Sequence, residues 1–191
     1  MKRALDIVAS AVGLAVLSPL LAGVALAVRL TSTGPVLFRQ VRVGRGDTRF
    51  EILKFRTMRV SNEGPQVTPG ADPRITAVGR VLRRTKLDEL PQLVNVLRGE
   101  MSLVGPRPEV PDLARHWTPE QAATILSVRP GITDPASIEF RDESALMAGQ
   151  DDPEAFYIAN LLPRKATMYV EYVENRTFLG DLRLVMRTIV P

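Results

Sequence analysis

The sequence predicts a mostly helical α+β protein, with an N-terminal re-entrant membrane helix (helix-break-helix) and a small cytosolic domain that has a β-hairpin and interfacial amphipathic helices. Three observations predict this class. The 22 residues from Ile7 to Val28 carry no charge, residues 36–57 resemble two paired strands, and apolar residues elsewhere recur at helical spacing. We expect two parts, a membrane segment over residues 1–30 and a cytosol-facing domain over residues 31–191.

The charge-free segment allows three interpretations. A cleaved signal peptide would begin at Lys2 and Arg3, but Asp6 at its entrance and Pro19 at its midpoint disfavour cleavage. A spanning helix would have one flank poor in Lys and Arg. Both flanks are basic here, because Arg29 follows the segment as Lys2 and Arg3 precede it. This symmetry favours two cytoplasmic ends.

Ser18 and Pro19 supply the turn that such a re-entrant path needs. Proline removes one helical hydrogen bond, and the serine hydroxyl can satisfy a backbone group freed inside lipid. We expect the helix to enter one leaflet, break at these two residues and return.

A β-hairpin is predicted after the membrane segment. Segments 36–43 and 48–57 are rich in β-branched and aromatic residues and flank the turn Gly44–Asp47. Lys54 and Arg56 occupy alternate strand positions, so they would project from one face toward a phosphate or a lipid head group. Solvated strand charges are the alternative. Residues 60–75 are rich in proline, glycine and small polar residues, which predicts a mobile or substrate-covering loop.

A charged stretch, Arg80–Glu109, follows this loop. A one-faced helical pattern, interrupted between Thr85 and Glu89, is formed by Val78, Val81, Leu82, Leu90, Leu93, Val94 and Leu97. Pro91 either opens a second helix or kinks a continuous one. Asp88 and Glu89 therefore lie where backbone N–H groups are unpaired, which stabilises anions. An ionised carboxylate among arginines can be a nucleophile toward phosphorus or a magnesium ligand. The alternative is a helix cap.

Gly99 is expected to end this helical region, and the next two segments are predicted as turns. In Ser102–Glu109, two flanking prolines would fix the direction of Arg107, whose guanidinium is a planar fork for phosphate oxygens. Arg129–Thr133 (RPGIT) would hold another anion ligand, Arg129.

The C-terminal third is predicted to be helical. A capping box at Thr118–Gln121 opens a helix to about Ser127. Asp152 caps a helix that Pro163 breaks, and residues 164–175 continue helically. The last helix, Phe178–Val190, has an apolar stripe that would pack on the core or lie in the headgroup layer, formed by Phe178, Leu182, Val185, Met186 and Ile189.

Composition limits the chemistry. The 191 residues include no cysteine and one histidine, His116, which we interpret as structural or exposed. Thiol and multi-histidine metal chemistry are excluded, so any metal would be oxygen-ligated Mg²⁺ or Mn²⁺. The net charge of +4 suits an anionic partner. Aromatic residues make up only 5% and form no ladder with basic residues, so we expect no nucleic-acid binding.

Four runs together resemble a known family: KFRTM (Lys54–Met58), RRTKLDELPQL (Arg83–Leu93), MSLVGPRPE (Met101–Glu109) and RPGIT (Arg129–Thr133). In this order, behind an apolar segment, they resemble the bacterial sugar transferases. These are monotopic polyprenyl-phosphate phosphoglycosyl transferases, whose minimal catalytic members are about this long. The likeness covers nearly the whole chain.

The resemblance implies transfer of a sugar-1-phosphate from a UDP-sugar to polyprenyl phosphate, normally undecaprenyl phosphate, with release of UMP. It places the enzyme at the bacterial inner (cytoplasmic) membrane, on the cytoplasmic face, where it would initiate surface glycan assembly. On matching positions, Asp88 is the nucleophile that forms a phospho-sugar aspartyl intermediate, and Glu89 helps to hold Mg²⁺, with Asp88 as a second ligand. Candidate substrate ligands are Arg107, Arg129, Lys54, Arg56, Arg80, Arg83 and Glu109.

One run departs from the family pattern. Asp134–Arg141 replaces a more usual Gly-x-Ala-Gln run, which puts the donor sugar in doubt and makes Arg141, Asp142 and Glu143 second-tier candidates. Expected partners are a UDP-sugar, polyprenyl phosphate and membrane lipid, and a homodimer is an open alternative. Two other functions compete: a non-catalytic basic protein that binds the membrane surface, and a membrane glycosyltransferase that releases UDP.

Overall fold

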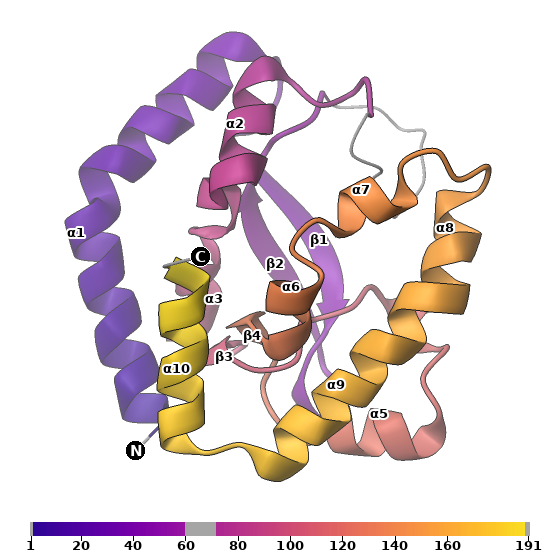
Figure 1. Ribbon diagram of the computed structural model, residues 1–191. Helices are drawn as coiled ribbons and strands as arrows, with labels where there is room; N and C mark the ends of the chain where they lie inside the picture. The colour runs from indigo at the N-terminus through magenta and orange to yellow at the C-terminus, as the bar shows by residue number, and fades with distance from the viewer. Residues whose placement is uncertain (1, 60–71, 190–191) are drawn as a thin grey trace.

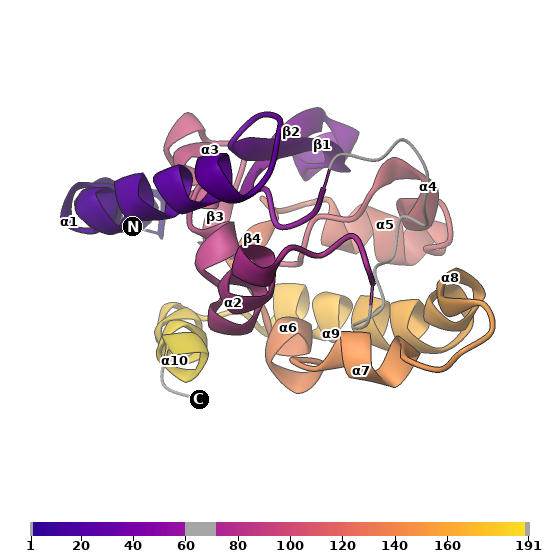
Figure 2. The ribbon, with the colours of Figure 1, turned by 90° about the horizontal axis from the view of Figure 1, so that it is seen from above.

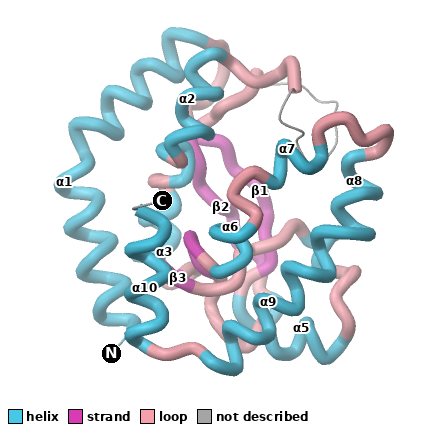
Figure 3. The backbone as a smooth tube through the Cα atoms, viewed as in Figure 1, coloured by secondary structure: helices cyan, strands magenta, loops and turns pink. Residues whose placement is uncertain are grey.

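The computed structural model of the protein describes residues 2–59 and 72–189. Helices dominate it (Figure 3). Of the predicted loop over residues 60–75, residues 60–71 lie outside the described residues, and 72–75 lie in a turn and an isolated bridge. The elements in chain order are α1 (Lys2–Thr31), β1 (Leu37–Val43), β2 (Arg49–Phe55), α2 (Ala77–Thr85), α3 (Gln92–Arg98), β3 (Ser102–Val104), α4 (Pro111–Ala114), α5 (Pro119–Ile125), β4 (Gly131–Thr133), α6 (Pro135–Glu139), α7 (Glu143–Met147), α8 (Pro153–Phe156), α9 (Leu162–Asn175) and α10 (Phe178–Ile189).

The elements form two layers (Figures 1 and 2). One layer holds α1, α3 and the β1–β2 hairpin, and the other holds the C-terminal helices α6 to α10. The short strands β3 and β4 lie between them. The mostly helical α+β class is therefore confirmed.

Helix α1 is continuous, which corrects the predicted interruption. Its 30 residues stay helical through Pro19, although the ribbon bends midway (Figure 1). Pro19 has no N–H to donate to the carbonyl of Ala15, four residues earlier. The hydroxyl of Ser18 donates to that carbonyl at 2.8 Å instead. The freed acceptor is thus satisfied locally, as predicted for Ser18, and the helix has no need to break.

The first turn of α1 is fixed to the domain by charged side chains. Lys2 donates to the carbonyl of Val104 at 2.8 Å and to the hydroxyl of Tyr172 at 3.1 Å, and it pairs with Asp181. Asp6 is buried and accepts hydrogen bonds from the Ser102 hydroxyl and the Leu103 N–H. Arg3 donates to the carbonyls of Val96 and Leu97, at the end of α3.

The last turns of α1 pack on the same domain. Val24 and Val28 are buried in a cluster with Phe55 of β2 and Leu82 of α2. Between its two ends, α1 exposes apolar side chains, among them Val8, Val12, Val16, Leu20 and Leu26. By length and composition α1 could cross a membrane, but its two ends contact one globular body.

The predicted β-hairpin is confirmed. Strands β1 and β2 pair antiparallel from Leu37 opposite Phe55 to Val43 opposite Arg49. The turn between them contains Gly46 at φ 65°, a left-handed conformation that glycine adopts without strain.

Strands β3 and β4 were not predicted, because both segments were assigned as turns. They pair in parallel, Ser102 beside Gly131 and Val104 beside Thr133. Gly131 is required by the close approach of the chains, since a Cβ there would lie 2.1 Å from the nitrogen of Gly105. Strands of three residues are too short to show an alternating pattern, and each is paired only with a distant segment.

The C-terminal helices form the largest core. Pro163 does not break the chain of helices, because it occupies the first turn of α9, where proline needs no partner for an N–H. A π-helical turn, Tyr157–Leu161, joins α8 to α9. The core includes Trp117, Phe140, Met147, Leu162 and Tyr169.

The apolar stripe of α10 packs only in part. Val185 contacts a cluster formed by Val104, Tyr172 and Val173, whereas other members of the stripe are exposed, namely Phe178, Leu182 and Met186. The side chain of Ile189 lies outside the described residues.

Candidate active site

The acid pair Asp88–Glu89 lies on a tight turn between two helices. Helix α2 ends at Thr85, Lys86 adopts φ 57°, and Leu87–Glu89 forms one 3₁₀ turn before α3 begins. The predicted interruption of the helical pattern is confirmed.

Glu89 is held by two cations from different elements. Lys54, on β2, donates to its Oε1 at 2.8 Å. Arg107, in the turn after β3, forks onto both carboxylate oxygens at 2.5 and 3.3 Å. Burial alone would raise the pKa of Glu89, but Arg107 and Lys54 outweigh it and hold the pKa well below its usual value. Glu89 is therefore a permanent anion at neutral pH.

Asp88 has the opposite environment. The residue is 7% exposed, and its Oδ1 is buried with no hydrogen-bond partner among the residues that the structure describes. Burial raises the pKa of Asp88, and the negative charge of Glu89 raises it further, while Lys54, Arg83 and Lys86 counteract this only in part. An ionised, poorly solvated oxygen of this kind is a strong nucleophile and an available metal ligand.

The other predicted basic ligands divide into two groups. Arg83 lies on α2 and donates to Thr57 Oγ1 at 2.9 Å. Burial lowers the pKa of Arg83, and the negative charge of Asp88 counteracts this lowering only in part. Arg80 is exposed on the same helix.

Arg56 and Arg129 support the backbone elsewhere instead. Arg56 donates to the carbonyl and hydroxyl of Ser32, just after α1; its Nε and Nη1 are buried without a hydrogen-bond partner. Arg129 donates to the carbonyl of Gly99 at 2.8 Å. Among residues 2–59 and 72–189, neither side chain forms a hydrogen bond or ion pair with Asp88 or Glu89.

Glu109 leads to a buried polar chain that sequence reasoning missed. It is 3% exposed and accepts a hydrogen bond from the Tyr157 hydroxyl at 2.8 Å. Lys165 donates to Tyr157 at 3.0 Å and to Glu143 at 2.9 Å. Arg42 lies 3.9 Å from Glu109 and donates to the carbonyl of Pro108, next to Arg107.

No local signal in the sequence points to Arg42, Tyr157 or Lys165, because these residues meet only after β1 and α9 pack around the Arg107 turn. The second-tier candidates also separate. Glu143 belongs to this polar chain, Asp142 is exposed, and Arg141 donates to the carbonyl of Arg187 on α10.

The acid pair has few oxygen atoms available to bind a metal. Among residues 2–59 and 72–189, no three acidic or histidine side chains gather as a metal site. Asp88 Oδ1 is available, whereas both oxygens of Glu89 are engaged by cations. A pair of carboxylates fits Mg²⁺ when substrate phosphates complete its ligands.

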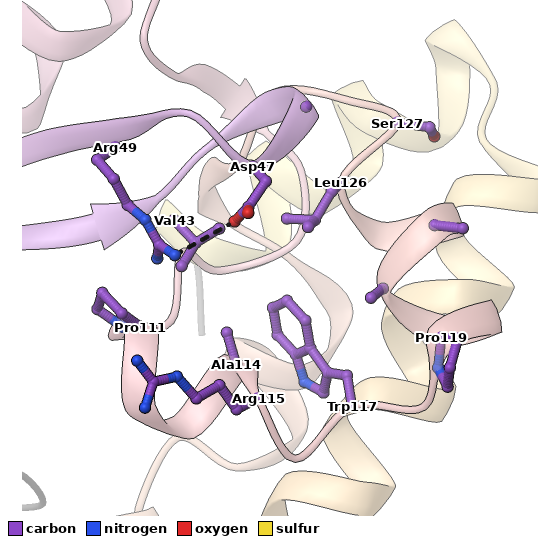
Figure 4. A pocket seen from close by; sticks show the side chains of 13 residues that line it. Val43, Asp47, Arg49, Pro111, Ala114, Arg115, Trp117, Pro119, Leu126 and Ser127 are labelled. Carbon is purple, nitrogen blue, oxygen red and sulfur yellow. Dashed lines mark ion pairs between the residues drawn. The ribbon is translucent and has the colours of Figure 1, made fainter.

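A separate open pocket lies at the turn end of the hairpin (Figure 4). Its volume is about 660 Å³, and its lining includes Val43, Arg49, Ala114, Trp117 and Leu126. The lining contains none of the predicted site residues. His116, beside Trp117, is exposed, as expected.

Known proteins resemble this chain over its whole length. A family model described as bacterial sugar transferase matches residues 1–191. The UDP-glucose:undecaprenyl-phosphate glucose-1-phosphate transferase of Caulobacter vibrioides is 42% identical over 98% of this chain and 68% of its own. The Escherichia coli K12 protein of the same name is 38% identical over 99% of this chain, which spans only 39% of that relative.

A relative of similar length is the exopolysaccharide production protein PSS of Rhizobium leguminosarum. It is 39% identical, and the match covers all of this chain and 94% of the relative. Together with the family match over residues 1–191, these identities show that the chain belongs to the bacterial sugar transferase family.

Proposed function

We propose that this protein transfers a sugar-1-phosphate from a UDP-sugar to a polyprenyl phosphate, undecaprenyl phosphate in bacteria, and releases UMP. The observation that carries the proposal is the contrast within the acid pair: Asp88 has a buried, unpaired oxygen, while its neighbour Glu89 is held by Lys54 and Arg107. The names of relatives with the same substrates support it.

In the first step, Asp88 Oδ1 attacks the phosphorus that bears the sugar. A P–O bond forms to the aspartate, the bond between the two phosphates breaks, and UMP leaves with that electron pair. In the second step, an oxygen of the polyprenyl phosphate attacks the same phosphorus. Asp88 is released as a carboxylate, and the lipid carries a sugar diphosphate. Two displacements allow one site to serve a soluble donor and a lipid acceptor in turn.

Lys54, Arg107 and Arg83 would neutralise the diphosphate, which otherwise repels an attacking carboxylate. Because Lys54 and Arg107 already bind Glu89, an incoming diphosphate competes for them and frees Glu89 oxygens. Asp88 and Glu89 would then hold Mg²⁺, which supplies charge neutralisation on the phosphates. We expect EDTA to abolish turnover and added Mg²⁺ or Mn²⁺ to restore it.

We also propose that α1 enters one leaflet of the inner membrane and returns to the cytoplasmic face. Lys2 and Asp6 at one end and Val28 at the other contact the same domain, so a membrane cannot separate the ends without breaking these contacts. The exposed apolar side chains between them would face lipid. This arrangement places the acid pair on the side from which UDP-sugars arrive.

The nucleotide released from a UDP-sugar tests the proposal. We expect UMP from the wild type and none from Asp88→Asn, which should remain in the membrane fraction. UDP instead of UMP would indicate a glycosyltransferase, and lipid binding without nucleotide release would indicate a non-catalytic membrane protein. A panel of UDP-sugars would identify the donor.

A further inference from the structure

A buried polar chain of Glu109, Tyr157 and Lys165 connects the Arg107 turn to the carboxylate of Glu143, on α7. Four contacts make this connection. Glu109, two residues after Arg107, accepts from Tyr157 at 2.8 Å, and Lys165 joins Tyr157 to Glu143 at 3.0 and 2.9 Å. The N–H of Val43 donates to the carbonyl of Glu109 and fixes the backbone at the other end. Glu143 is thus held at a fixed spacing from the Arg107 turn.

Glu143 differs from the other members of this chain in its exposure. The side chain of Lys165 is 3% exposed and that of Glu143 is 34% exposed. Lys165 donates to Oε2 of Glu143, and Oε1 has no hydrogen-bond partner among residues 2–59 and 72–189. Within the described part of the chain, one carboxylate oxygen is therefore fixed and the other is available to accept.

The hydrogen-bonded chain ties Glu143 to the Arg107 turn, whose guanidinium binds Glu89. Burial raises the pKa of Glu143, but the charge and hydrogen bond of Lys165, together with the charges of Arg107 and Lys86, outweigh it and lower the pKa. Lys86 directly precedes the Asp88 turn, and Arg107 forks onto Glu89. An anion at this position would repel a phosphate. It suits a neutral group rich in hydroxyls.

We propose that Glu143 is a specificity-determining residue that accepts a hydrogen bond from a hydroxyl group of the donor's sugar. This inference rests on the proposed function. The sugar is bonded to the phosphorus that Asp88 attacks, whereas the ribose of UDP is separated from it by the second phosphate. Arg107 binds Glu89, the neighbour of Asp88, so we expect a carboxylate tethered to the Arg107 turn to be nearer to the sugar than to the ribose. Lys165, Tyr157 and Glu109 act as positioning residues that hold the carboxylate.

The test compares donors within one preparation of each variant. For the wild type and Glu143→Gln, kcat/KM for UMP release is measured with UDP-glucose, UDP-galactose, UDP-N-acetylglucosamine and UDP-N-acetylgalactosamine, and then with deoxy analogues of the preferred donor. The matched control is Glu139→Gln, the same change at an exposed residue one helix earlier. A ratio between donors does not depend on the fraction of folded enzyme, so reduced stability does not obscure the result.

We expect Glu143→Gln to lower kcat/KM for the preferred donor on the order of 10- to 100-fold, the range for a lost hydrogen bond to a charged group. Discrimination against one deoxy analogue should fall by the same factor, while inhibition by free UMP and the control variant stay unchanged. An unchanged donor ratio overturns the inference and leaves the proposed function standing. Weaker inhibition by UMP with an unchanged donor ratio also overturns the inference, because it would assign Glu143 to the ribose; the proposed function would still stand. Wild type that releases no UMP from any donor overturns both.

Discussion

At the scale of single residues, two neighbouring carboxylates have opposite electrostatics. Glu89 is paired with Lys54 and Arg107, so its charge is stabilised. Asp88 has a buried oxygen to which no described residue donates a hydrogen bond, so its charge is destabilised. The two residues share one 3₁₀ turn, and the ion pairs of Lys54 and Arg107 go to Glu89. We therefore assign the attack on phosphorus to Asp88, and to Glu89 the role of helping to hold Mg²⁺.

We predict that Asp88→Asn stabilises the protein near neutral pH while it abolishes turnover. Because burial raises the pKa of Asp88, the folded state binds its proton more tightly, and ionisation lowers stability as pH rises through the raised pKa. Relative to wild type, Asp88→Asn should gain about 1–3 kcal/mol in free energy of unfolding. The gain is complete above the raised pKa of Asp88 and disappears below the ordinary aspartate pKa. Thermal unfolding in EDTA at several pH values measures it. A variant less stable than wild type at neutral pH would contradict the prediction.

Glu89→Gln should have the opposite effect on stability. It leaves Arg107 and Lys54 partly buried without their counter-charge, which costs about 3 kcal/mol for a buried pair. Because the pKa of Glu89 is depressed, its contribution is present above the ordinary glutamate value and is lost as pH falls toward the depressed pKa. The same unfolding series detects this, and equal stability of Glu89→Gln and wild type at neutral pH would rule it out.

Lys54 and Arg107 were predicted on a hairpin and in a proline-flanked turn, and in the structure both contact Glu89. That they bind substrate phosphates stays a prediction. Arg56 and Arg129 have the same charge in equally suggestive runs, but their hydrogen bonds go to Ser32 and Gly99. A guanidinium can bind a phosphate or a backbone carbonyl equally well, so residue type alone cannot distinguish the two roles.

At the scale of elements, α1 depends on contacts that a hydropathy pattern does not reveal. Lys2 appeared as a flanking charge, yet it hydrogen-bonds Val104 and Tyr172 and pairs with Asp181. Asp6 appeared as an obstacle to a signal peptide, yet it binds the backbone of β3. The apolar length of α1 could be predicted because it depends on the local sequence alone. These anchors could not, because they join residues about a hundred or more positions apart.

The topology of α1 gives a prediction with two cysteines. The chain has no native cysteine, and Ala4 and Thr33 are exposed on either side of the apolar segment. We expect Ala4→Cys and Thr33→Cys to react with a membrane-impermeant maleimide only from the cytoplasmic side. Lys2 is less suitable for labelling because its side chain anchors the helix. Periplasmic labelling of Ala4→Cys would show that α1 spans the membrane.

The hairpin and most helices followed from their patterns, but β3 and β4 did not. The antiparallel β1–β2 pair is local, seven residues on each side of one turn. The parallel pair β3–β4 joins three-residue strands across α4 and α5. Such a strand has too few residues to alternate, and its stability comes from a partner distant in sequence.

At the scale of the whole molecule, the two layers bring the parts of the site together. The layer of α1, α3 and the hairpin contributes Lys54 and the membrane segment, and the C-terminal layer contributes Lys165 and Glu143 (Figure 2). The Asp88 turn and the Arg107 turn connect them. If a soluble donor and a lipid acceptor react in turn at Asp88, as proposed, double-reciprocal plots should give parallel lines when both substrates are varied. Intersecting lines would indicate a ternary complex instead.

The most direct test of the central claim is mass analysis of Asp88 after reaction with the UDP-sugar alone. With no polyprenyl phosphate present, the account predicts one equivalent of UMP and one sugar-phosphate bound to the peptide that contains Asp88. Later addition of polyprenyl phosphate should remove the adduct as lipid product forms. Product formation without any adduct on Asp88, or by Asp88→Asn, would contradict the account.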